Sequence, residues 1–98
     1  MKITLTIPAF EVKALINYGI VTEKNVRPGL VEEGLEYHNV TIKYEDEECD
    51  GPHDTSFYKV RGYAGRELWL SVEPREMYDE VDSLNGVCER VSKFNLLT

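Results

Sequence analysis

The first residues of the chain alternate between polar and apolar side chains. Ile3, Leu5 and Ile7 are separated by single polar residues, and this period of two predicts a strand with one buried face. Pro8 ends the strand and suits the first turn of a helix, because its missing N–H would be unpaired there. We predict a helix from about residue 8 to 18, closed by Gly19 in the left-handed conformation that often follows a helix. Its apolar stripe consists of Phe10, Ala14, Leu15 and Tyr18.

Three later segments also alternate, over residues 38–44, 57–63 and 68–72. Short turns between successive strands imply antiparallel neighbours, so we predict a three-stranded antiparallel meander. Residues 20–36 carry the turn signal Arg27-Pro28-Gly29 and a few apolar residues. We predict there a connection with one or two helical turns.

A helical period returns after Pro74. The apolar residues Met77, Val81, Leu84, Cys88 and Val91 are spaced by four, three, four and three positions, which predicts an amphipathic helix. Asn85-Gly86 predicts a kink within it. The expected fold is therefore α+β, a single domain over residues 1–98 in the order strand–helix–three-stranded antiparallel meander–helix.

Negative charge is concentrated in two short stretches. The chain has 18 acidic and 11 basic side chains and a net charge of −7, which opposes binding to nucleic acid or anionic membrane and favours basic partners. Six of the acids fall in residues 45–54 and five in residues 73–82. Two dense acidic clusters can imitate the charge density of a nucleic-acid duplex.

The stretch 45–54 joins two predicted strands, and we predict a solvated acidic loop there. As a calcium loop it fails at the twelfth position, which is Phe57 where a bidentate Glu is needed. As a zinc site, Cys49, Asp50, His53 and Asp54 supply no second pair of ligands. The sequence therefore predicts no metal.

The two stretches give a set of predicted partner-binding residues, with the tryptophan as an aromatic anchor. The partner would be a basic protein, such as a component of a nucleic-acid-binding complex. The predicted residues are Glu45, Asp46, Glu47, Glu48, Asp50, Asp54, Trp69, Glu73, Glu76, Asp79 and Glu80.

A second hypothesis concerns the sheet face opposite the core. Aromatic and basic residues alternate there, as on single-stranded nucleic-acid platforms. The competing and favoured interpretation is that the first helix covers this face and the aromatics form a second core layer. The residues are Lys43, Phe57, Lys59, Arg61, Tyr63 and Trp69.

The sequence predicts neither an enzyme nor a cofactor. It has no phosphate-binding glycine loop and no nucleophile motif, and His38 falls on the apolar side of a strand, where a hydrogen-bonded core residue is expected. Two cysteines are too few for a secreted disulfide framework. No signal peptide or membrane span is apparent, so we expect the cytoplasm of a bacterium or of an infected cell.

In size, acidity and lack of a catalytic motif, the chain resembles the small inhibitors that phages encode against host defences, anti-CRISPR proteins among them. The resemblance covers no motif, so it implies a class of function and no site residues. The sequence thus predicts a phage- or mobile-element-encoded inhibitor that blocks a basic, nucleic-acid-binding partner with its acidic surface. The alternatives are a single-stranded nucleic-acid binder and a structural or assembly subunit of a larger complex.

Overall fold

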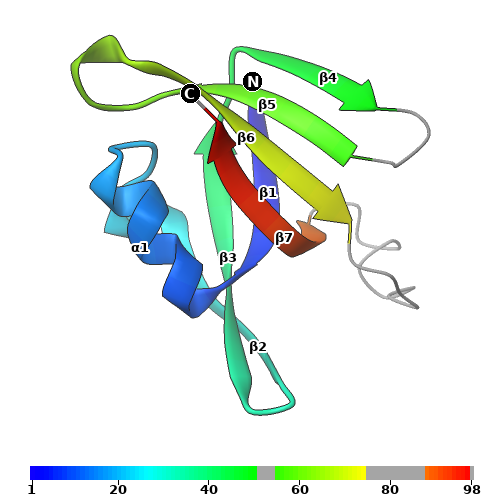
Figure 1. Cartoon of the computed structure of the whole chain (residues 1–98). Coiled ribbons are helices and arrows are strands. Elements are labelled where there is room, and N and C mark those ends of the chain that lie inside the picture. The colour runs from blue at the N-terminus through cyan, green and yellow to red at the C-terminus, as the bar shows by residue number, and fades with distance from the viewer. Residues whose placement is uncertain (51–54, 75–87, 98) are drawn as a thin grey trace.

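The computed structural model describes the backbone of residues 1–50, 55–74 and 88–97, and the side chains of these residues except 50, 74 and 88–93. Strands dominate this part of the chain (Figure 1). In chain order the elements are β1 (Lys2–Pro8), α1 (Ala9–Asn17), η1 (Glu23–Asn25), β2 (Val26–Glu32), β3 (Leu35–Lys43), β4 (Asp46–Asp50), β5 (Thr55–Arg61), η3 (Tyr63–Gly65), β6 (Glu67–Pro74) and β7 (Cys88–Leu97).

The seven strands follow one another in the order β2-β3-β1-β7-β6-β5-β4. All neighbours are antiparallel except β1 and β7, which are parallel. The start of β7 pairs with β1, with Cys88 opposite Thr4, and its end pairs with β6, with Leu97 opposite Trp69. β7 therefore joins two sheets, which we name sheet A (β2, β3 and β1) and sheet B (β6, β5 and β4).

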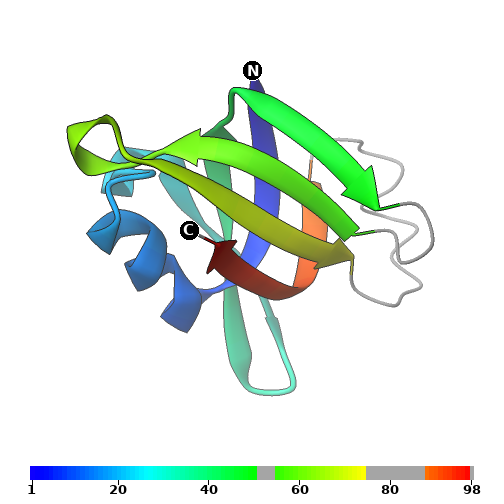
Figure 2. The ribbon, with the colours of Figure 1, turned by 45° about the horizontal axis from the view of Figure 1, so that its top comes forward.

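The two sheets are joined a second time at the corner between β3 and β4. The backbone N–H of Tyr44 donates to the carbonyl of Met1 at 2.8 Å, on the sheet A side of the corner. The next N–H, that of Glu45, donates to the carbonyl of Lys59 in sheet B, also at 2.8 Å. The sheets consequently curve around one shared interior (Figure 2).

The core lies between the two sheets. Alternate residues of β1, β3, β5 and β6 point into it, as the sequence pattern predicts for these four strands. Burying a side chain the size of leucine contributes about 1.5–3 kcal/mol, so this interior is the main stabilising feature. The buried apolar residues are Leu5, Ile7, Val12, Leu15, Val21, Val40, Ile42, Tyr58, Val60, Leu68, Leu70, Val72 and Phe94.

Helix α1 forms where the sequence predicts it, but with a different buried stripe. Val12 and Leu15 enter the core, whereas Phe10 is 67% exposed and Tyr18 is 39% exposed. The main contacts of the helix are with β1 and β3. The helix is therefore turned so that Val12 and Leu15 face β1 and β3, and Phe10 faces solvent.

The loop between β5 and β6 is fastened to the end of α1. The N–H of Tyr63 donates to the carbonyl of Tyr18 at 3.0 Å. A Cβ on Gly62 would lie only 2.3 Å from that same oxygen. Gly19 follows the helix with a φ of +77°, as predicted. The Tyr63 ring packs against Gly19, at the position that a Cβ would occupy. Glycine at positions 19 and 62 thus allows sheet B to contact the helix.

The predicted α+β fold is wrong, because the chain is mostly β with a single α-helix in the described part. Residues 26–32, expected as a connection with helical turns, form β2 and a hairpin with β3. The predicted meander is correct only for β5 and β6, which are antiparallel neighbours. β3 pairs with β1 and β2 instead. Local alternation identified strands, but pairing depends on contacts between distant segments.

The predicted C-terminal helix is also wrong where the structure tests it. Residues 88–97, which include the last two members of its stripe, form β7. The physical reason is the open edge between β1 and β6, whose backbone groups are satisfied by a strand and not by a helix. A period of two is present at Phe94 and Leu96, both turned toward the core. Residues 75–87 of the predicted helix lie outside the described residues.

Candidate functional site

The candidate site is the outer face of sheet B together with its edge strand β4. Pairing places side chains of β4, β5, β6 and β7 in rows on this face. One row runs from Asp46 through Lys59 and Trp69 to Leu97, and the next from Glu48 through Phe57 to Ser71. Tyr58 and Val60, which alternate with Phe57 and Lys59 along β5, are buried on the opposite face.

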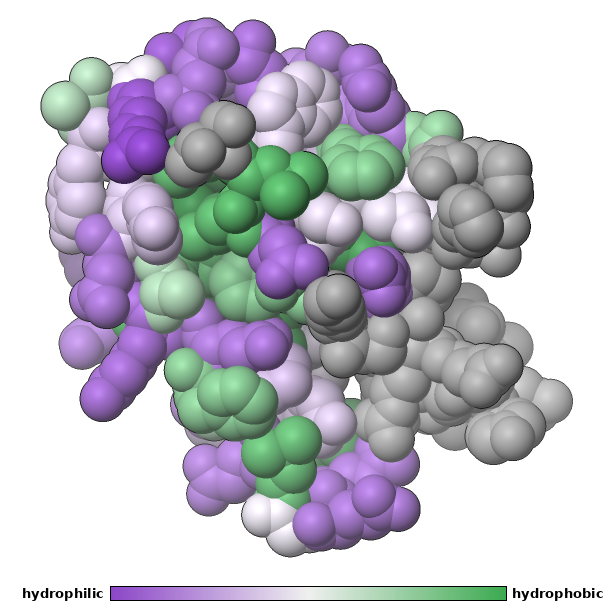
Figure 3. All heavy atoms as spheres, in the orientation of Figure 1, coloured by the Kyte–Doolittle hydropathy of each residue, from purple (hydrophilic) through white to green (hydrophobic). Residues whose placement is uncertain are grey.

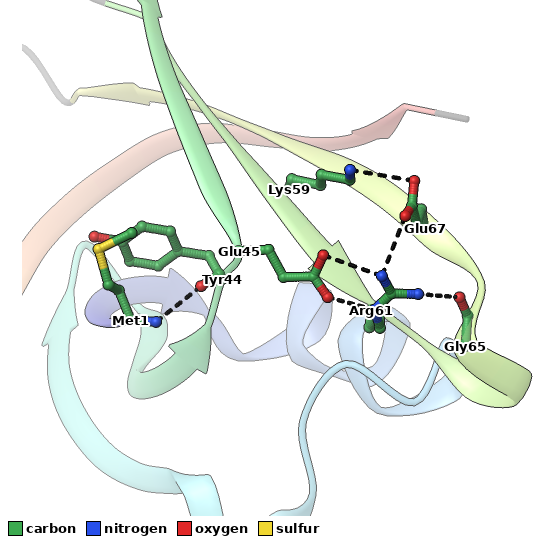
Figure 4. A network of polar contacts seen from close by, with 7 residues as sticks. All are labelled: Met1, Tyr44, Glu45, Lys59, Arg61, Gly65 and Glu67. Carbon is green, nitrogen blue, oxygen red and sulfur yellow. Dashed lines mark hydrogen bonds and ion pairs between the residues drawn. The ribbon is translucent and has the colours of Figure 1, made fainter.

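Lys59 and Arg61, the basic residues of this face whose side chains the structure describes, are both ion-paired (Figure 4). The Lys59 Nζ lies 3.3 Å from a carboxylate oxygen of Glu67, and an Arg61 nitrogen lies 3.2 Å from the other. Arg61 also donates two hydrogen bonds to the carboxylate of Glu45 and one, at 2.9 Å, to the carbonyl of Gly65. The hydrogen bond to Glu45, with the charges of Glu45 and Glu67, raises the pKa of the Arg61 guanidinium above its already high value.

The acids of β4 are arranged differently. Asp46, Glu47 and Glu48 are exposed, and β4 is the outermost strand in the order of the sheet. No ion pair to these three is seen among the described residues. Asp46 accepts a hydrogen bond from the N–H of Glu47 at 2.9 Å, which is a local contact. An edge strand bearing charge on both faces resists pairing with a further strand.

The predicted loop 45–54 is therefore a strand for half of its length. Asp46–Asp50 pairs with β5, starting with Asp46 opposite Lys59 and ending with Asp50 opposite Thr55. In the orientation of Figure 1, hydrophilic side chains dominate the upper edge of the molecule, where β4 and the β5–β6 connection lie (Figure 3). The acids are thus held in a fixed spacing by the backbone ladder.

The two acidic stretches reach the same end of sheet B. β4 and β6 are both antiparallel to β5, so they run in the same direction and their final residues, Asp50 and Pro74, lie at one end. Strands separated by one neighbour are about 10 Å apart. Glu73, at the end of β6, is half-buried. The side chains of Asp54, Glu76, Asp79 and Glu80, which were also predicted to bind a partner, lie outside the described residues.

The predicted aromatic and basic face is confirmed in part by the register. Phe57, Lys59, Arg61 and Trp69 do share the outer face of sheet B. Lys43 belongs to sheet A, and Tyr63 lies in the loop over Gly19, so neither is part of this face. The favoured expectation that α1 covers the face is wrong, since the helix packs mainly on β1 and β3.

Other chemistry is sparse in the described residues. No three His, Cys, Asp or Glu side chains among them come together in a way that could hold a metal ion. Cys49 is a free, exposed thiol 3.8 Å from the Ser56 hydroxyl. His38, predicted to be hydrogen-bonded in the core, is half-buried and its Nδ1 has no partner in the described structure.

One group of site residues escaped the sequence analysis. Lys2 and Lys43 are directly opposite each other in the β1–β3 ladder, and both are exposed. Only the register between two strands about forty residues apart reveals this pair. A cavity of about 240 Å³ lies beside it, bordered also by Thr22, Asn25 and Thr41.

Within the described part of the chain, no helix combines the length and the apolar composition that crossing a membrane requires. Comparison of the chain with protein-family models, with curated proteins and with solved structures finds no match.

Proposed function

We propose that the protein is a small acidic interaction module that binds a basic, nucleic-acid-binding protein and blocks it, as an inhibitor encoded by a phage or another mobile element would do. The observation that carries this proposal is the parallel course of β4 and β6. The described parts of the two acidic stretches, which end at Asp50 and Pro74, reach the same end of sheet B. A single partner surface can therefore contact the end of sheet B where both described parts lie.

The spacing of the β4 acids supports imitation of a nucleic-acid strand. Consecutive residues of an antiparallel strand advance about 3.4 Å, and each strand of a DNA duplex carries one phosphate per about 3.4 Å of axis. Successive side chains of a strand point to opposite faces, so one face of β4 presents Asp46 and Glu48 about 6.8 Å apart and the other presents Glu47. A groove that binds phosphates with lysines and arginines would meet carboxylates on one face of β4 at about twice the phosphate repeat.

The ion pairs divide the predicted acids into two groups. Glu45 and Glu67 already neutralise Arg61 and Lys59, so they have less charge to offer a partner. Asp46, Glu47 and Glu48 carry no such pairing in the described structure. We therefore assign the partner contact to these three residues.

The experiment compares two triple variants with the same change in net charge. One is Asp46→Lys with Glu47→Lys and Glu48→Lys. The matched control reverses three exposed acids elsewhere, Glu23, Glu33 and Glu36. Each protein is immobilised and used to capture proteins from a host lysate at about 0.05 M and about 0.5 M salt. Each captured protein is then assayed for nucleic-acid binding in the presence and in the absence of the module.

We expect the β4 variant to lose capture at low salt by at least tenfold, while the control retains it, and we expect wild type to compete with nucleic acid for the captured protein. Equal capture by the two variants would show that bulk charge and not β4 is responsible. A captured protein that binds nucleic acid equally well in the presence of the module would contradict the inhibitory role.

A second candidate, single-stranded nucleic-acid binding, is favoured by one observation: Phe57, Lys59 and Trp69 share an outer face that α1 leaves uncovered. The ion pairs of Lys59 and the neighbouring acids of β4 oppose it. Titration with oligonucleotides at low salt should leave the Trp69 fluorescence unchanged if the first proposal holds. A saturable quench would favour the second candidate.

A further inference from the structure

Lys2 and Lys43 form an arrangement that packing and pairing do not account for. Their positions are directly opposite in an antiparallel ladder, where side chains lie about 5 Å apart at Cβ and like charges repel. Both project from the face opposite the Ile3–Ile42 pair, of which Ile42 is buried and Ile3 partly buried, so neither lysine is needed for the core. In Figure 1 the beginning of β1 and the end of β3 lie side by side.

These two ammonium groups have no acidic partner among the described residues. The outer face of sheet B differs, because there the two described cations, Lys59 and Arg61, have carboxylate oxygens within 3.3 Å. A chain with 18 acidic side chains thus leaves this pair of lysines unneutralised in the described structure.

The cavity beside the lysines supplies further donors. Asn25 accepts hydrogen bonds at its Oδ1 from the N–H and hydroxyl of Thr22, at 3.1 and 3.2 Å. This leaves the amide Nδ2 of Asn25 as a donor without a partner in the described part of the chain. The hydroxyl of Thr41, 3.3 Å from that of Thr4, lies on the same wall. None of the described residues that border the cavity is acidic.

We propose that this cavity binds the phosphate group of a small phosphate monoester or of inorganic phosphate. Two ammonium groups match the charge of about −1.5 to −2 that a phosphate monoester carries at neutral pH. Lysine is a common ligand of phosphate, and hydroxyl and amide donors complete the set. The volume of about 240 Å³ is below the usual range for drug-sized ligands of roughly 300–1,000 Å³, which favours a small anion.

This site is independent of the proposed partner surface. Lys2, Lys43 and Asn25 all belong to sheet A or to the segment beside it, whereas the acids assigned to partner binding lie on β4. Loss of one activity by mutation therefore leaves the other intact. An experiment can therefore contradict one proposal without contradicting the other.

The test titrates ¹⁵N-labelled protein with inorganic phosphate, and separately with adenosine 5′-monophosphate, at constant ionic strength kept with chloride. Saturable shifts are expected in the amide resonances of Lys2, Thr22, Asn25, Thr41 and Lys43. Binding should tighten several-fold between pH 5.5 and 7.5 (about two units spanning the second phosphate pKa near 6). Stronger binding of the nucleotide would identify an ester as ligand, and equal binding would identify free phosphate.

The decisive comparison uses two double variants that each remove two exposed cations. Lys2→Gln with Lys43→Gln should weaken phosphate binding at least tenfold, whereas Lys13→Gln with Arg66→Gln should change it less than twofold. Melting curves establish that both variants are folded. Equal weakening by the two variants, or shifts reproduced by chloride alone, would overturn the proposal. Binding of a single-stranded oligonucleotide without a response to either small phosphate would overturn it as well.

Discussion

A pair of neighbouring cations lies on the outer face of each sheet, and the two pairs have opposite surroundings. Lys59 and Arg61 of sheet B are matched by the carboxylates of Glu45 and Glu67. Lys2 and Lys43 of sheet A face each other across the ladder without a carboxylate in the described structure. The net charge of −7 describes neither face, because local pairing decides which charges remain available to a ligand.

The difference assigns separate roles to the two faces. In sheet B the ion pairs neutralise the cations and leave the β4 acids as the free charge, which suits a basic partner. In sheet A the unpaired charge of Lys2 and Lys43 is positive and borders a small cavity lined by both polar and apolar residues, which suits an anion. Surface ion pairs contribute at most about 1 kcal/mol each, so the charge pattern bears on recognition more than on stability.

The largest effect on stability is expected at Gly62, where the loop between β5 and β6 contacts the end of α1. Its replacement by alanine would place a Cβ 2.3 Å from the Tyr18 carbonyl, and a backbone oxygen cannot move aside as a side chain can. We expect Gly62→Ala to destabilise the protein by about 2–3 kcal/mol, the upper range for overpacking. Urea denaturation measures the change.

The matched control for Gly62 is Gly34, in the β2–β3 turn. Gly34 has a φ of +78° but no atom within 4 Å of its Cβ position. Gly34→Ala should cost only about 1 kcal/mol, from backbone strain. Equal costs at the two positions would show that the contact of Gly62 with the helix is unimportant, and sheet B would then be free to move relative to α1.

Removing a cation should change the stability of the protein in opposite directions on the two faces. Arg61→Met would leave Glu45 and Glu67 close together without their shared partner. We expect the melting temperature to fall by a few degrees at low ionic strength and by less in 1 M salt (about a 3 Å Debye length), where charges are screened. A variant as stable as wild type at low salt would contradict a stabilising role for the network.

On sheet A the corresponding change should stabilise. Lys43→Gln removes the repulsion with Lys2, and we expect a gain of about 0.2–1 kcal/mol at low salt, the range for a cross-strand pair. Lys13→Gln, which changes the net charge equally on an exposed helix position, serves as control. The net charge is −7, so the loss of a cation by itself increases general repulsion and lowers stability. Equal gains for the two variants in thermal melts would show that the lysine pair is not responsible.

The sequence alone predicts the strands whose apolar residues alternate, because their buried faces are encoded locally. β1, β3, β5 and β6 are of this kind, with Leu5 and Leu70 as typical inward positions. β4 has no such pattern, since its acids are exposed on both faces. Its structure comes from the backbone groups of β5, which accept a neighbouring strand whatever its side chains are.

The candidate sites divide in the same way. The order of residues in the sequence locates the acidic stretches, so Asp46 and Glu48 can be predicted to lie at a charged surface. Glu45 differs from them because it is ion-paired with Arg61. This difference cannot be predicted without the register between β4 and β5. The pairing of Lys2 with Lys43 likewise depends on non-local contacts. No local pattern contains that information.

Glu11 provides the smallest test, as a carboxylate that has no cation in contact. Its Oε2 is buried and has no hydrogen-bond partner in the described structure, and burial raises the pKa of this carboxyl above its ordinary value of 4.5. A raised pKa means that the folded state binds the proton more tightly than the unfolded state. Stability should therefore fall as pH rises from the ordinary pKa through the raised one.

Glu11→Gln should consequently raise stability at pH 7 by no more than about 0.5 kcal/mol, the usual scale of substitutions near the surface. The gain should vanish as pH falls through the raised pKa of Glu11, where the wild-type carboxyl is already neutral. An opposing effect exists, since Glu11 lies in the first turn of α1, where a negative charge interacts favourably with the helix dipole. Chemical denaturation at several pH values decides between them: a variant less stable than wild type at pH 7 would mean that the dipole outweighs burial, and that an unpaired charge on this fold carries no penalty.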